Sequence, residues 1–151
     1  MPAQAAAGAQ RGRLTCHPRR EMETGVAGWD SLSAAASESN PFFESWYLLP
    51  ALRAFDPEGN VRMLRFEAGG RLAGLMPIAA SNAYYDKPVP HLASWLHDNC
   101  FLGAPLVARG AERAFWEALF AWADANAGVA LFLHLSQVPL EGALYEALKA
   151  V

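Results

Sequence analysis

Cysteine is scarce in this sequence: the 151 residues hold only Cys16 and Cys100. Two cysteines are too few for a disulfide scaffold, and they form no CxxC pair of the kind that binds zinc. Positive charge is also in the minority, since 12 Lys and Arg face 15 Asp and Glu for a net charge of −3. Because phosphate neutralisation needs a basic surface, we expect no nucleic-acid partner.

Long apolar runs and export signals are missing as well. No run reaches the ~18–20 residues that a membrane helix needs. Arg19-Arg20 is followed by Glu-Met-Glu-Thr rather than by the apolar stretch of an export signal. We therefore expect a cytoplasmic protein that makes no membrane contact. There is no Walker A sequence, no dinucleotide-binding glycine fingerprint and no GxSxG motif.

The sequence does have the apolar material for a core. Hydrophobic residues make up 53% and charged residues 18%, with 5 Trp and 8 Phe, which excludes disorder over most of the chain. The length is close to that of one average domain. Residues 1–12 show no periodicity and predict a flexible tail, so we expect the domain to span residues 13–151.

Apolar periodicity predicts a mixed α/β fold. Period-two or continuously apolar runs predict strands, and runs with apolar residues three and four apart predict helices. In chain order we expect a strand at 13–17, helices at 26–37 and 42–55, strands at 61–67, 71–78, 91–97 and 101–108, a helix at 111–126, a strand at 129–135 and a helix from 139 to 151. A helix between two late strands indicates a βαβ crossover in the sheet.

Several local signals refine this order. Asn40 is suited to cap a helix with Pro41 in its first turn, and Pro50 predicts a kink or break further along. Gly69-Gly70 joins two strands as a tight hairpin turn, because glycine tolerates the positive φ that such a turn requires. Pro77 is expected at a strand end or an edge. The run 129–135 is almost entirely apolar and predicts a central strand covered on both faces.

This order resembles the GNAT N-acetyltransferase fold. The resemblance is sharper to the BioF2-like, CelD-type (cellulose biosynthesis-associated) branch related to the FemAB aminoacyl transferases. It covers about residues 25–150, and the matching features are Trp29 with Leu32, Asn40-Pro41-Phe42 before a Trp-bearing helix, and a hairpin ending Gly74-Leu75-Met76-Pro77. Proteins of this branch are built from two GNAT-like halves, and a single GNAT unit normally adds two strands after its last helix. The resemblance therefore implies the N-terminal half of such a protein, incomplete at its C-terminus, with exposed apolar surface there that a second half or self-association would cover.

The resemblance also implies where acetyl-CoA or another acyl-CoA is held. GNAT proteins bind the diphosphate of the donor on backbone N–H groups at a helix N-terminus, in the pattern Gln/Arg-x-x-Gly-x-Gly/Ala. The corresponding stretch here gives Arg109, Gly110, Ala111, Arg113 and Ala114 as cofactor-binding residues, but Glu112 replaces the central glycine. A carboxylate there repels a diphosphate, so we expect a degenerate donor site and a donor bound by the second half.

Acyl transfer to an amine needs a base for the amine and an acid for the leaving thiolate. His97 and Asp98 lie where the resemblance places the splayed central strands, and His91 is a further candidate base. Tyr84 and Tyr85 are candidates for the acid or for the wall of a groove that binds a small-molecule amine acceptor. Cys100, His97 and Asp98 are too close in sequence for a hydrolase triad, and His91 and His97 lack further ligands for a metal.

Three readings of the sequence stay open. The chain is an N-acyltransferase unit that depends on a second half, or a catalytically inert structural module that keeps the fold, or a self-standing GNAT enzyme whose donor site lies elsewhere in the sequence. Glu112 favours the second reading for this chain taken alone.

Overall fold

A computed structural model describes residues 12–151; the predicted tail at 1–12 lies almost entirely outside that range. The strands are β1 (Arg13–Pro18), β2 (Arg62–Ala68), β3 (Arg71–Ser81), β4 (His91–Ser94), β5 (Leu106–Val107) and β6 (Leu133–His134). The helices are α1 (Arg19–Met22), α2 (Val26–Ala35), the 3-10 turn η1 (Pro41–Phe43), α3 (Ser45–Phe55), α4 (Glu112–Asn126) and α5 (Gly142–Lys149).

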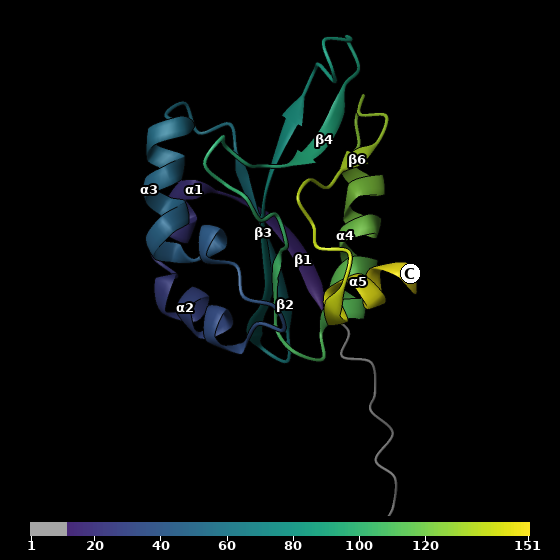
Figure 1. The fold of residues 1–151 in the computed structure, drawn as a ribbon. Helices are drawn as coiled ribbons and strands as arrows, with labels where there is room; N and C mark the ends of the chain where they lie inside the picture. Colours follow the sequence, from purple (N-terminus) through teal and green to yellow (C-terminus); the bar gives the residue numbers. More distant parts are fainter. Residues whose placement is uncertain (1–11) are drawn as a thin grey trace, which may run out of the picture.

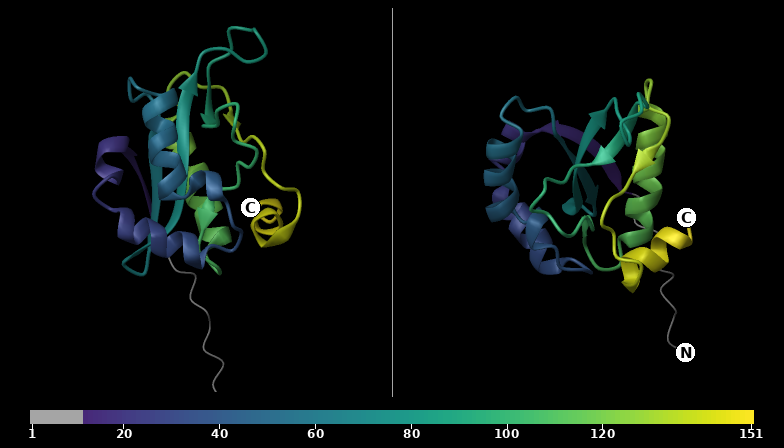
Figure 2. Two further views of the ribbon diagram at one scale, coloured as in Figure 1. Left: turned by 60° about the vertical axis from the view of Figure 1, so that its left-hand side comes forward. Right: turned by 45° about the horizontal axis from the view of Figure 1, so that its top comes forward.

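One mixed sheet forms the centre of the molecule. Its strands follow the order β1-β2-β3-β4-β6, with β5 also paired to β3. All pairs are antiparallel except β4 with β6. Helices α1, α2 and α3 lie on one side of the sheet, and α4 and α5 lie on the other (Figure 1; Figure 2 gives two further views). The α/β prediction is thus confirmed, and α4 makes the expected crossover between strands.

The core lies on both faces of the sheet, and its largest fully buried side chains are aromatic. Trp29 of α2 and Trp116 of α4 are fully buried, and each indole N–H donates to a backbone carbonyl, those of Phe43 and Leu144 at 2.9 Å. On the α4 face, Phe66 packs edge-on against Phe115 with ring centroids 6.0 Å apart. Each buried indole is therefore fixed both by packing and by a satisfied donor.

The β2–β3 hairpin has the predicted turn. Gly69 and Gly70 have φ values of 60° and 73°, which only glycine adopts without strain. Pro77, however, lies inside β3 rather than at its end. Proline is tolerated at this position because residue 77 faces the place where β4 leaves the sheet. Its carbonyl accepts from the N–H of Trp95, just after β4, and the N–H that proline lacks would point to the same side.

The two strands predicted after this hairpin are shorter than expected. β4 and β5 pair with the same side of β3, at Ile78–Ser81 and at Gly74-Leu75, so they act as one strand interrupted by residues 95–105. Gly103 and Pro105 lie in this excursion from the sheet. The prediction of two separate strands at 91–97 and 101–108 was therefore wrong in their lengths.

The helix prediction at 42–55 also needs a correction. Asn40 does cap the first turn, since its side-chain oxygen accepts from the N–H of Phe42 at 3.0 Å, but that turn is η1, and α3 begins only at Ser45. Pro50 lies inside α3 without breaking it. The short helix α1 was not predicted.

The apolar run 129–135 is not a central strand. Only Leu133 and His134 form a strand, and β6 lies at the edge of the sheet. Val129 and Leu131 are 78% and 73% exposed. The exposed apolar surface expected toward the C-terminus is present here and at Leu140, which is 75% exposed. In residues 12–151 there is no helix with the length and apolarity to cross a membrane.

Candidate active site

The predicted donor-binding stretch lies at the junction between β5 and α4. Gly110 has φ +85°, a value that requires glycine, and the chain then turns into α4 at Glu112. The first helical hydrogen bond runs from Phe115 N–H to the carbonyl of Ala111. A turn with this glycine, placed between a strand and a long helix, has the backbone shape that an anion cradle needs.

The hydrogen-bond donors of this junction are largely taken within the chain. Arg109 N–H donates to the carbonyl of Ala35 at 3.1 Å, Ala111 N–H donates to Ala108 at 3.0 Å, and Gly110 N–H donates to a carboxylate oxygen of Glu112 at 3.1 Å. The side chain of Arg113 is turned along α4 to Glu117, at 2.8 Å.

The open donors of the junction lie in the first turn of α4, at Glu112, Arg113 and the half-buried Ala114; among the described residues, their N–H groups have no hydrogen bond. The Glu112 carboxylate accepts from Gly110 N–H in the same turn, so an incoming diphosphate would meet its negative charge. These residues do not fit a diphosphate group.

The edge of β5 that faces away from β3 is also covered. Ser37 N–H donates to the carbonyl of Val107 at 2.8 Å, and together with the Arg109–Ala35 bond this makes a short antiparallel bridge between Ala36 and Ala108. The chain after α2 thus runs beside β5 as an extra strand would. The chain itself therefore occupies this edge beside Ala108.

Residues 102–104 are held between two other parts of the chain. On one side, the fully buried amide of Asn40 donates to the carbonyls of Leu102 and Ala104, at 3.2 and 2.7 Å. On the other side, Gly103 N–H donates to the carbonyl of Gln137 at 2.8 Å. The excursion 95–105 is therefore bonded on one side to the segment that follows α2 and on the other side to the chain after β6.

His97 lies in an aromatic cluster on the excursion. Its ring stacks on Phe55 at 4.3 Å and on Tyr47 at 6.0 Å, with interplanar angles of 17° and 10°. Its Nδ1 accepts from the N–H of Asn99 at 3.2 Å, and its Nε2 is buried without a hydrogen-bond partner among residues 12–151. Burial lowers the pKa of His97, and the nearby Asp98 opposes that shift only in part. His97 is thus a neutral, packed imidazole at pH 7.

Tyr85 belongs to a different cluster. It lies in the tight turn between β3 and β4, is 82% exposed, and contacts Tyr84 edge-on at 4.7 Å. Tyr84 in turn contacts His91 and His134, at 5.4 and 5.3 Å. His97 and Asp98 are neighbours in the sequence, but Tyr85 lies in a separate aromatic cluster. The catalytic roles of all three residues stay predictions.

The aromatic cluster of Tyr47, Phe55 and His97 was not predicted from the sequence, and neither was the place of Cys100 beside it. Tyr47, Phe55 and His97 come from segments about 40 residues apart, and no local period links them. Burial raises the pKa of the Cys100 thiol, and it also raises the pKa of the Tyr47 hydroxyl. The thiol is consequently a packing group rather than a nucleophile.

Replacing His97 by glutamine, H97Q, tests this packing role through pH. Because the folded-state pKa of His97 is lowered, the unfolded chain binds more protons near pH 6, and the stabilising contribution of the neutral ring is lost as pH falls below about 6.5. The wild-type chain should therefore lose more stability than H97Q between pH 7.5 and pH 5. Urea unfolding at both pH values measures this. Equal losses in the two proteins would contradict the lowered pKa.

Comparison with known proteins bears on the fold. No protein-family model and no curated protein matches the sequence. Among solved structures, a ribosomal-protein-alanine N-acetyltransferase from Brucella melitensis biovar Abortus 2308 matches with a TM-score of 0.53 and 13% identity, over 93% of this chain and 87% of that one. An aminoglycoside acetyltransferase from an uncultured soil metagenomic sample matches with a TM-score of 0.50 and 12% identity, over 88% and 82% of the two chains. The chain has the GNAT acetyltransferase fold, as predicted.

Proposed function

We propose that this chain is a GNAT-fold N-acyltransferase module that contributes an acceptor surface and does not hold acyl-CoA by itself. Of the structures that it resembles, one is named as a ribosomal-protein-alanine N-acetyltransferase and another as an aminoglycoside acetyltransferase. Acetyl transfer is common to both names. At 13% and 12% identity the likeness carries the fold, so the reaction class is our inference from it.

The junction between β5 and α4 carries the second part of the proposal. Three of its amides, those of Arg109, Gly110 and Ala111, already donate within the chain, and that of Gly110 does so to a carboxylate. An acyl-CoA diphosphate would have to displace that carboxylate and would be repelled by it. A second GNAT-like half, as in BioF2-like and CelD-type proteins, would supply the donor site instead.

The acceptor surface that we propose is the aromatic cluster on α3 and the excursion 95–105. Phe55 and Phe101 are 55% and 71% exposed, so the cluster offers a wide apolar wall to a ligand. His97 shapes this wall rather than moving a proton, because one of its nitrogens already accepts a hydrogen bond and the other is enclosed. A cytoplasmic location is proposed as well, since both cysteines are free thiols.

Binding of acetyl-CoA, measured by isothermal titration, tests the donor half of the proposal. We expect no sub-micromolar binding to the wild-type chain. Removing the charge with E112Q should tighten binding at least about tenfold, because two unit charges ~4 Å apart interact by roughly 4 kcal/mol at an effective dielectric constant of about 20. The matched control is E117Q, which removes a charge from the same helix at a residue paired with Arg113. Sub-micromolar binding to the wild-type chain, or equal effects of E112Q and E117Q, would contradict the proposal.

The same junction also favours a second function, that of a catalytically inert interaction module. Turnover of acyl-CoA with mixed amine acceptors separates the two, when it is assayed on this chain and on any longer product of the gene. Activity in the longer product alone supports the acyltransferase module. Inactivity of both proteins supports the inert module. Activity of this chain, assayed by itself, contradicts the proposal that its donor site is incomplete.

A further inference from the structure

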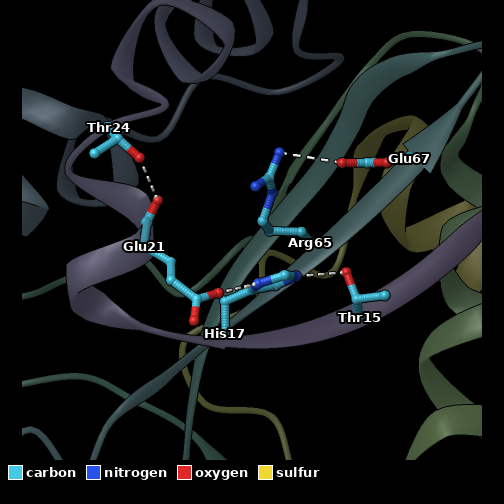
Figure 3. A network of polar contacts seen from close by, with 6 residues as sticks. All are labelled: Thr15, His17, Glu21, Thr24, Arg65 and Glu67. Atoms are coloured by element: carbon cyan, nitrogen blue, oxygen red, sulfur yellow. Dashed lines mark hydrogen bonds and ion pairs between the residues drawn. The ribbon is translucent and has the colours of Figure 1, made fainter.

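A groove of about 760 Å³ runs between α2 and the β2–β3 hairpin, with three arginines along it. Arg65 comes from β2, Arg71 begins β3, and Arg109 follows β5. We call it the arginine groove. It adjoins the β5–α4 junction, whose Arg109 and Ala111 line both, but Arg65 lies on the face of the sheet opposite α4, because its neighbour Phe66 packs on Phe115 of α4. Figure 3 shows Arg65 on that face, near α1 and the pair of His17 with Glu21.

Arg65 has a hydrogen-bond donor without an acceptor. One of its terminal nitrogens pairs with Glu67 at 3.1 Å (Figure 3). Its Nε is buried and has no hydrogen-bond partner among residues 12–151. A buried donor left unpaired costs free energy, and native structures rarely tolerate one without a ligand, water or function to account for it. A bound anion would satisfy this donor.

The opposite wall of the groove leaves room for a ligand. It is formed by the side of α2 that carries Gly25, Gly28, Ser31 and Ala35. A Cβ atom added at Gly28 would meet no atom within 4 Å, and neither would one added at Gly70 on the hairpin. Gly25 is the N-cap of α2 and gives it no side-chain hydrogen bond, so the uncapped first turn of this ten-residue helix borders the groove.

The charge of the groove selects the class of ligand. Glu67 balances one of the three guanidinium groups, and within the described part of the chain neither Arg71 nor Arg109 has a carboxylate in ion-pair range. Two positive charges are left in a chain whose net charge is −3. Guanidinium groups bind phosphate oxygens through paired, charge-assisted hydrogen bonds. We propose that the arginine groove is a binding site for a phosphate-bearing small molecule, with Arg65, Arg71 and Arg109 as its ligands.

Titration with inorganic pyrophosphate at low ionic strength tests this site on the chain as it is. We expect saturable binding, followed by calorimetry and by amide chemical shifts that move at Gly25, Gly28 and Gly70. R71Q changes an exposed residue and should weaken binding about tenfold without affecting folding. R65Q should weaken it at least as much, and R65K less, because lysine keeps the charge but loses the paired geometry.

Two control variants separate this site from others. R53Q removes an exposed arginine that pairs with Glu23 outside the groove, and it should leave the affinity unchanged. R113Q removes an arginine in the first turn of α4 and should also have no effect. Loss of binding in R113Q but not in R71Q would place the anion at α4 and overturn the proposal. Unsaturable binding, or equal loss in all four glutamine variants, would show nonspecific attraction and overturn it as well.

Discussion

The variant N40D is expected to lower the free energy of unfolding by about 3–4 kcal/mol at pH 7. Asn40 is fully buried, and its amide nitrogen lies 3.2 and 2.7 Å from the carbonyl oxygens of Leu102 and Ala104. In the variant, a carboxylate oxygen takes the place of that nitrogen. Two hydrogen bonds become two contacts between acceptors, and a charge is buried without a partner.

The substitution isolates this effect because it leaves the other role of Asn40 intact. The carboxyl can still accept from the N–H of Phe42, so the cap of η1 is kept. N82D makes the same chemical change at an exposed residue in the β3–β4 loop and should be nearly neutral. Denaturant unfolding of the three proteins measures the difference.

The pH dependence of N40D provides an independent check. Burial beside two carbonyls raises the pKa of the introduced carboxyl above its unfolded value of about 3.9. The destabilisation therefore develops as pH rises above that value, and the gap to the wild-type chain should narrow as pH is lowered from 7 to 4. A gap that is constant over this range would mean that lost packing, and not the charge, causes the effect.

Asn40 also illustrates what sequence could and could not predict. Its capping of the next turn was predicted, because a cap depends on residues within three positions of each other. Its second role, joining residues 102 and 104 more than 60 positions away, left no mark on local sequence. The same holds for the junction at 109–111, where the start of the following helix was predicted from the sequence but the pairing of Arg109 with Ala35 was not.

The prediction of a central strand at 129–135 was wrong for a related reason. Apolar residues show that a segment can be buried, but not which element covers it. Here the parallel partner β4 has only four residues and pairs with β6 only at Leu133 and His134, so Val129 and Leu131, which precede β6, are left exposed. The β2–β3 hairpin and α4 were predicted well, since their turn glycines and their apolar periods are local properties.

The variant G103A should destabilise the chain by about 2–4 kcal/mol, because a methyl group there has no space to occupy. A Cβ atom at residue 103 would overlap the carbonyl oxygen of Ser136 and would lie 3.3 Å from a methyl carbon of Leu96. The first of these is a backbone atom, which cannot rotate away as a side chain would. Relief requires residues 102–104 to separate from 136–137, which breaks the hydrogen bond from Gly103 N–H to Gln137.

G28A is the matched control, since it makes the same substitution where the chain can accept it. Gly28 lies inside α2, its added Cβ would contact nothing within 4 Å, and alanine favours the helix by about 1 kcal/mol. Denaturant unfolding should therefore show opposite signs for the two variants with similar m-values. If G103A were as stable as the wild-type chain, the close approach of the excursion to the chain after β6 would be wrong.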